Sequence, residues 1–454
     1  MELLGSASIP KALLAMGIPT MIGMLVNAFY NLVDAYFVGG LGESQMGAIS
    51  VVYPLGQVVV GLGLLFGNGA ASYISRLLGR GDNENADKVA STALYSSISV
   101  GAVIIIISMV FLHPILKLLG ATDSILPYAA TYAGIYIVSC IFNVFNVTMN
   151  NIVTSEGAAK TTMWALLTGA ALNIALDPLF IYVFDLGVAG AAIATAISQV
   201  VSTCVYLTYI LRKKSVFHFR VKDCTYSKEI MSEIFKIGIP TLVFQILTSL
   251  SISLINNAAG NYSDSAIAGM GVVTRLISMG SLSVFGFIKG FQPIAGYSYG
   301  AKKFDRLRES IKTSILWSTV FCVIFGLVLA LFSTAIVSQF TKGDAEMIRI
   351  GATSLKANGI TIMLFGFYTV YSSLFLALGK GREGFILGAC RQGICFIPVI
   401  LLLPMVWGLN GILYAQPIAD VLSAIITVFM AIPLHKRLNE MQKQIATIST
   451  NNKN

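Results

Sequence analysis

Residues 172–181, LNIALDPLFI, place a carboxylate and an amide inside an apolar run that is long enough to cross a membrane. Asn173 and Asp177 are four residues apart, so an α-helix stacks both side chains on one face. A charged group in a bilayer core costs at least ~2.5–3.5 kcal/mol on insertion scales, and it usually faces a cavity and serves a function. The stretch therefore predicts a membrane helix that carries a binding site.

The composition of the whole chain agrees with a membrane protein. Of its 454 residues, 56% are hydrophobic and 11% are charged, whereas soluble domains carry about 25% charged residues. The net charge of +9 invites a nucleic-acid interpretation. Most basic residues, however, lie in short loops between apolar runs, as is typical of membrane proteins. We therefore expect a lipid bilayer around the chain and no nucleic-acid partner.

Apolar runs between charged loops predict twelve spans, since a span needs about 20 mostly apolar residues. Their expected limits are 12–38, 46–75, 90–112, 126–153, 162–184, 189–211, 232–258, 266–297, 311–336, 347–377, 386–406 and 411–433. Lys and Arg collect in alternate loops, which predicts a multi-pass protein of the cell inner membrane with both termini in the cytoplasm. The first run lacks a small-residue cleavage site, so we interpret it as a retained span.

The two halves of the chain repeat with a shift of 221 residues. GIP at 17–19 returns at 238–240, and Gly79 returns as Gly300. The two glycines of LGVAGAA, 186–192, return as the two glycines of WGLNGIL, 407–413. Six spans in each half make the repeats parallel, an arrangement found in secondary transporters. The expected fold is an all-α membrane protein with twelve transmembrane helices in two pseudo-symmetric six-helix lobes: 1–211 and 232–434, joined by a cytoplasmic linker at 212–231 and followed by a tail at 435–454.

Several motifs resemble the multidrug and toxic compound extrusion (MATE) family, especially its bacterial MepA-like and DinF-like branches. They are NLVDAYFVGGLG at 31–42, SEGAAK at 155–160, LNIALDPLFI at 172–181 and FQPIAGYSYGAKK at 291–303. The resemblance implies an antiporter that exports cationic or amphipathic organic compounds in exchange for sodium ions or protons.

The resemblance also implies a cation site in the first lobe, at Asp34, Asn173, Asp177 and Thr195. Carboxylate, amide and hydroxyl oxygens suit sodium, and two carboxylates in one dry site also favour uptake of a proton. The sequence leaves both ions open. Pro19 matches a first-helix proline that bends in relatives, and Pro178 removes a helix hydrogen bond, so both are candidate hinges.

Candidate cargo contacts lie in both halves of the chain. Aromatic, amide and Met side chains could stack on or adapt to a flat organic molecule; the candidates are Tyr30, Asn31, Tyr136 and Met149. Lys289, Arg391 and Asp420 are ionisable residues within second-half spans; Lys289 and Arg391 could pair with Asp420, or the three could line a cavity. Two cations there would disfavour cationic cargo, so anionic or zwitterionic cargo stays open.

No ATP-binding G-x-x-x-x-G-K-[ST] motif and no catalytic Ser/His/Asp or H-E-x-x-H pattern occurs. We expect neither an enzyme nor a cofactor beyond the transported ion. The prediction is a monomeric secondary antiporter with a small-molecule substrate. The alternatives are a flippase for lipid-linked precursors, which would need a basic cavity, and a membrane receptor or scaffold that does not transport.

Overall fold

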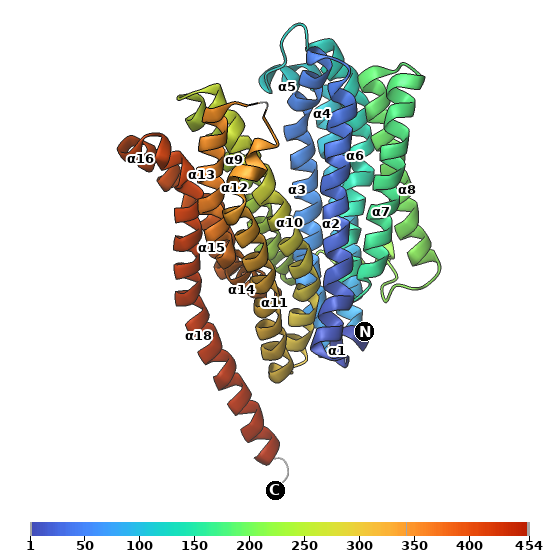
Figure 1. The fold of residues 1–454 in the computed structure, drawn as a ribbon. Helices are drawn as coiled ribbons and strands as arrows, with labels where there is room; N and C mark the ends of the chain where they lie inside the picture. Colours follow the sequence, from blue (N-terminus) through green and yellow to red (C-terminus); the bar gives the residue numbers. More distant parts are fainter. Residues whose placement is uncertain (1, 342, 452–454) are drawn as a thin grey trace.

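The computed structural model describes residues 2–341 and 343–451, which form a bundle of long helices in two groups (Figure 1). Within these residues, twelve helices are long and apolar enough to cross a membrane, as the sequence predicts. They are Ile9–Gly39, Gly47–Arg80, Asn83–Val110, Leu126–Ser155, Ala159–Val183, Gly187–Leu211, Lys228–Gly260, Asp264–Gly300, Phe304–Leu331, Ala345–Ala377, Gly381–Trp407 and Ala415–Gln444.

The first lobe holds the long helices of the first half of the chain. These are α2 (Ile9–Gly39), α3 (Glu43–Arg80), α4 (Asn83–Val110), α6 (Leu126–Ser155), α7 (Ala159–Pro178) and α8 (Gly187–Leu211). The second lobe repeats the order with shorter pieces in its last spans. Its helices are α9 (Lys228–Gly260), α10 (Asp264–Gly300), α11 (Phe304–Leu331), α13 (Ala345–Thr361), α14 (Phe365–Ala377), α15 (Gly381–Ala389), α16 (Phe396–Trp407) and α18 (Ala415–Asn451). Short helices α1 (Glu2–Gly5), α5 (Leu112–Leu118), α12 (Ser333–Ser338) and α17 (Leu409–Leu413) lie at the ends of these spans.

Polar residues in the loops start several of the spans. The side chains of Asp82, Ser227, Ser263 and Asp344 each accept a hydrogen bond from the backbone N–H three residues later. Such caps satisfy N–H groups that a helix leaves without a partner in its first turn. The caps explain why α4, α9, α10 and α13 begin where the apolar runs meet these residues.

The glycine landmarks of the repeat have the same structural role in both lobes. Gly187 and Gly408 both have positive φ, 54° and 58°, a conformation that L side chains rarely adopt. A Cβ on Gly190 would meet the backbone of Phe180, and one on Gly411 would meet the backbone of Leu403. The repeated glycines therefore allow the same close turn between the fifth and sixth span of each lobe, which accounts for the pseudo-symmetry.

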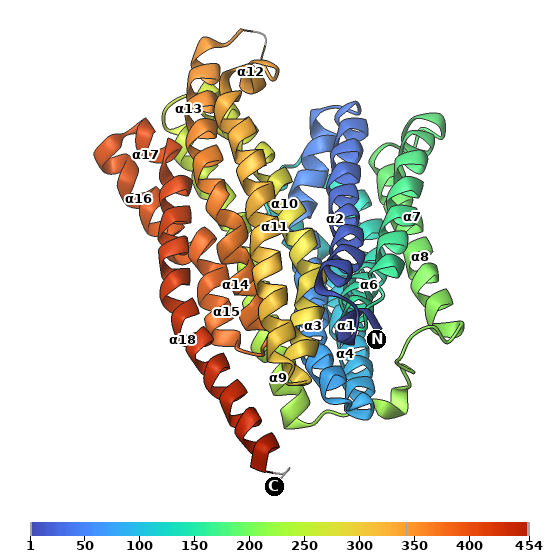
Figure 2. The same ribbon diagram turned by 60° about the horizontal axis from the view of Figure 1, so that its bottom comes forward.

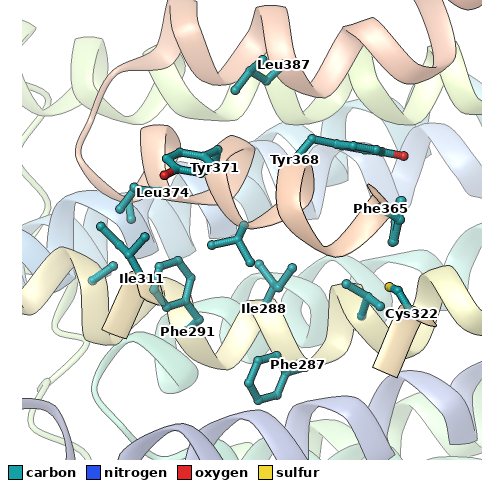
Figure 3. Close-up of a cluster of buried hydrophobic side chains, with 14 of the residues drawn as sticks. Phe287, Ile288, Phe291, Ile311, Cys322, Phe365, Tyr368, Tyr371, Leu374 and Leu387 are labelled. Atoms are coloured by element: carbon teal, nitrogen blue, oxygen red, sulfur yellow. The ribbon is translucent and has the colours of Figure 1, made fainter. Parts of the chain in front are cut away.

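The second lobe has a continuous apolar core between α10, α11 and α14. Ile288 of α10 points toward α14, which carries Phe365, whereas Phe287 points to the opposite side of α10, where Gly17 of α2 lies (Figure 3). These side chains are almost completely buried. This packing buries much of α10, and α10 carries the polar residues described below.

The two lobes touch at the end of the bundle where both termini lie, which we call the basic end. Arg76 of α3 forms an ion pair with Glu233 of α9, and a Cβ on Gly79 or Gly300 would collide with backbone of the other lobe. Toward the opposite end, the helices of the two lobes diverge (Figure 2). The space between the lobes is therefore closed at the basic end.

Candidate ion site and central cavity

Three helices of the first lobe bring the predicted cation ligands together. Asp34 comes from α2, Asn173 and Asp177 from α7, and Thr195 from α8; we call these four residues the first-lobe cluster. The Nδ2 of Asn173 lies 3.5 Å from Oδ1 of Asp177 and 3.5 Å from Oγ1 of Thr195. The carboxyl groups of Asp34 and Asp177 are close enough to interact electrostatically. The spacing of four along α7 thus places both of its polar side chains on the face that meets α2.

Three oxygen atoms of the cluster are buried and lack a hydrogen-bond partner among the described residues. They are Oδ1 of Asp34, Oδ1 of Asn173 and Oδ2 of Asp177. Buried polar groups in proteins nearly always have a partner, so unpartnered ones need an explanation such as an ion. Carboxylate and amide oxygens are ligands for hard cations, and a proton shared by the two carboxyls would also relieve their repulsion. The donor set fits sodium or a proton.

The other first-lobe candidates lie in different surroundings. Tyr30, one helical turn before Asp34, is close to both carboxylates of the cluster, and Tyr136 stacks on Tyr132 with 5.5 Å between ring centroids. Asn31 is exposed and donates to the carbonyl of Asn27. Met149 is fully buried in the first-lobe core. In the described part of the chain, none of Tyr30, Asn31, Tyr136 and Met149 lines the cavity between the two lobes, which is described below.

The two candidate hinge prolines differ in their effect on the helix. α7 ends at Pro178 and continues as one π-helical turn, Leu179–Val183, because the proline removes a backbone donor. π-turns of this kind occur frequently at functional sites. Pro19 lies inside the continuous helix α2, where the neighbouring Thr20 hydroxyl donates to the carbonyl of Gly286 at 2.6 Å.

A cavity of about 510 Å³ lies between the lobes, mostly against the second lobe. Its walls come mainly from α9, α10, α14, α15 and the π-helical turn Cys390–Ile394 that follows α15, and Met24, Leu64, Asn68 and Asn151 close it from the first lobe. This volume is in the range of pockets that bind drug-sized molecules. Lys289 and Arg391 both line it.

Arg391 is held by a buried acidic partner. Its Nε lies 3.0 Å from Oδ1 of Asp420, which also accepts from Gln416 Nε2 at 2.9 Å. The guanidinium group lies over the ring of Phe365, 4.7 Å from the ring centre. Asp420 itself is buried behind Arg391 and is not among the described residues that line the cavity. Its structural effect is to neutralise and orient Arg391.

The sequence reasoning missed three polar residues beside Lys289. Asn68, Asn151 and Gln292 line the cavity next to the lysine. Gln292 follows Lys289 by three residues in IKGFQP, and this spacing on one helix predicts a shared face. Asn68 and Asn151 come from other helices, so the sequence carries no signal that brings them there.

Comparison with known proteins gives the family of this architecture. The MatE family model matches residues 19–179 and 240–402, more than half of the chain. The chain belongs to the MATE family. The two matched segments begin 221 residues apart, which agrees with the shift of the internal repeat.

Relatives and solved structures of the MATE family match over nearly the whole chain. Multidrug export protein MepA of Staphylococcus aureus strain MSSA476 is 32% identical over 429 residues, which are 94% of each chain. A crystal structure of MATE in complex with MaL6 has a TM-score of 0.91 at 26% identity and covers 97% of this chain and 99% of that chain. A MOP superfamily transporter of Pyrococcus furiosus, described as having a binding pocket of reverse polarity, has a TM-score of 0.89 at 26% identity, covering 97% and 98%. The relatives are transporters and not enzymes.

Proposed function

We propose that this protein is a secondary antiporter that exports amphipathic organic compounds and takes up sodium ions or protons in return. The observation that carries the proposal is the combination of the unpartnered buried oxygens in the first-lobe cluster with a separate drug-sized cavity between the lobes. One site suits a small cation and the other an organic molecule. The similarity to MepA, a multidrug export protein, supports the same function.

We propose that the protein is a multi-pass monomer of the cell inner membrane. Its basic end is proposed to face the cytoplasm. Loops rich in Lys and Arg stay in the cytoplasm, and both termini lie at this end. The lobes are closed there and diverge at the other end, so this conformation is open outward.

Coupling requires that the cation and the cargo prefer different conformations. We propose that a cation in the first-lobe cluster pulls α2 toward α7, since Asp34 and Asp177 approach each other from these helices. Bending of α2 at Pro19 would then narrow the first-lobe wall of the cavity, where Met24 lies. The cargo leaves outward, and rocking of the lobes delivers the cation inward.

Gradient-driven export tests this function. The protein is placed in proteoliposomes, sodium and pH gradients are imposed separately, and movement of ethidium and of an anionic dye is followed. We expect one gradient to drive export by the wild type and Asp34→Asn and Asp177→Asn to abolish it. Asp185→Asn is the matched control, because Asp185 is exposed at the end of the same span. Unchanged export by both cluster variants would contradict the proposed coupling site.

A flippase for lipid-linked precursors is the second candidate, because Lys289 and Arg391 make the cavity basic. Transfer of a fluorescent polyprenyl-linked sugar between leaflets, with no dye export under either gradient, would favour it. A non-transporting receptor would move neither molecule.

A further inference from the structure

We propose that the central cavity selects organic anions, and that Lys289 and Gln292 bind the carboxylate, sulfonate or phosphate of an otherwise apolar, drug-sized cargo. This inference rests on the proposed export function and names its substrate class.

The charges around the cavity carry the first part of the argument. Among the described residues that line it, Lys289 and Arg391 are cations and none is Asp or Glu. Asp420 already compensates Arg391 from behind. No ion pair joins Lys289 to a carboxylate in the part of the chain that the structure describes. An uncompensated buried cation is costly, and an anionic ligand would lower that cost.

The hydrogen bonds of Lys289 show how many donors of its ammonium group are available to a ligand. Its Nζ donates to Oδ1 of Asn150, across the gap between the lobes. The amide of Asn150 is oriented by its own Nδ2, which donates to the Tyr206 hydroxyl at 3.2 Å. An ammonium group has three N–H donors. One of them binds Asn150, and the other two remain for a ligand.

Gln292 supplies a second donor one helical turn from Lys289. Its Nε2 is buried and has no hydrogen-bond partner among the described residues. Both side chains line the same small recess beside the cavity, with Asn68, Asn151 and Thr154 around them. A carboxylate or sulfonate has enough oxygens to accept from the ammonium and from the amide at once.

The remaining wall fits an apolar body. Phe244, Phe285 and Ile277 line the cavity, and the rings of Phe244 and Phe285 pack edge to face, 5.9 Å between centroids. A flat hydrocarbon placed against these rings keeps its anionic group at the recess near the basic end. Among the described residues that line the cavity, Lys289 is the one cation without an acidic partner. Together with the size of the cavity and its apolar wall, this cation favours an amphipathic anion over a flat organic cation.

Equilibrium binding to the purified protein tests the proposal without any ion gradient. The probes are 4-(1-pyrenyl)butyrate and 4-(1-pyrenyl)butylammonium, which share a ring and a linker and differ in charge. Equilibrium dialysis in a nonionic detergent gives both dissociation constants. We expect the wild type to bind the anion at least about tenfold more tightly than the cation, since charge-assisted hydrogen bonds are the stronger kind.

Four variants identify the group responsible. Lys289→Met should weaken anion binding by about tenfold or more, and Gln292→Leu should weaken it less, because it removes a neutral donor. Lys289→Arg should keep the preference for the anion. Lys312→Met is the control, because Lys312 is an exposed lysine of the second lobe. A size-exclusion profile shows whether each variant is folded, and Gln292→Leu tests the recess if Lys289→Met does not fold.

Preference for the ammonium probe, or anion binding that is equal in the wild type, Lys289→Met and Gln292→Leu, would overturn the proposal. If a polyprenyl phosphate displaces the pyrenyl anion and no small organic anion does, the proposal that the cargo is drug-sized would be overturned. Because no gradient is used, anion binding can hold while gradient-driven export fails, so the two proposals fail separately.

Discussion

Arg76 and Glu233 join the two lobes at the basic end, with Nη2 of Arg76 2.7 Å from Oε2 of Glu233. Lys236 approaches the other oxygen of Glu233 at 3.4 Å, and the Arg76 guanidinium lies 5.2 Å from the ring centre of Tyr73. The side chains of the pair are 8% and 21% exposed, so solvent screens it only partly. In the proposed rocking of the lobes, this ion pair belongs to the contact that opens before the cavity reaches the basic side.

Removing the pair should shift the lobes toward the state that is open at the basic end. Hydrogen bonds between charged groups contribute about 1.5–3 kcal/mol, which corresponds to roughly a tenfold to hundredfold change in the ratio of two states. We expect Glu233→Gln to lengthen the distance between spin labels at Asn85 and Arg382, measured with the exposed Cys204 replaced by serine. Lys88→Ala, which breaks an exposed pair within the first lobe, is the control. An unchanged distance distribution would argue against the proposed gate.

The first-lobe cluster should depend more on Asn173 than on Thr195. Asn173 lies between Asp177 and Thr195 and has a buried oxygen without a partner in the part of the chain that the structure describes, whereas Thr195 contributes one hydroxyl. We expect Asn173→Leu to lower cation affinity about tenfold or more and Thr195→Val about threefold, given the usual cost of lost polar partners. Binding of radioactive sodium, or proton release on adding a competing ion, measures the effect. Equal losses in both variants would contradict the assigned geometry.

The Arg391–Asp420 pair should matter for stability more than for export. Breaking a buried pair by removing one partner costs about 3–5 kcal/mol, while replacing both partners by apolar residues is often neutral. We therefore expect Asp420→Leu to lower the melting temperature of the purified protein strongly and Arg391→Met/Asp420→Leu to regain most of the loss. A double variant that melts below the single variant would show that the pair has another role.

Glu156 should give the folded protein a pH dependence at the basic end. It is buried and accepts hydrogen bonds from Tyr209 at 2.7 Å, Val216 N–H at 2.8 Å and Ser215 at 3.0 Å, which hold the linker between the lobes against the first lobe. Burial raises the pKa of this carboxyl above its ordinary value of 4.5, although these hydrogen bonds oppose the shift. The folded chain thus holds the proton more tightly than the unfolded chain, and its stability falls as pH rises from near 4.5 to the raised folded-state pKa.

Glu156→Gln has no charge to bury and should not lose stability in that window. Melting temperatures of the wild type and the variant, measured at a series of pH values, should therefore diverge in favour of the variant as pH rises. Parallel curves would contradict the assigned pKa direction. Asp185→Asn, at an exposed carboxyl, controls for general effects of charge.

Much of the fold could be predicted from the sequence, because it depends on local chemistry. Apolar runs of sufficient length must form helices in a bilayer, since every backbone group needs a partner there. The repeated Gly187 and Gly408 fixed the positions of equivalent turns because few other residues adopt their backbone conformation. The spacing of Asn173 and Asp177 also predicted one helix face, since it depends only on the period of the helix.

Tertiary packing decided which polar residues share a site. Tyr30 and Met149 have the residue types of a cargo site, yet the first lies beside the carboxylates and the second in the core, because the rotation of each helix depends on its neighbours. The sequence leaves open whether Asp420 pairs with a buried cation or lines the cavity, and in the structure it pairs with Arg391 from behind the cavity wall. The sequence by itself determined the helices, the repeat and the acidic face of α7. Only the tertiary structure decided that Arg391 pairs with Asp420 while Lys289 has no acidic partner among the described residues, because charge compensation depends on distances that no local spacing encodes.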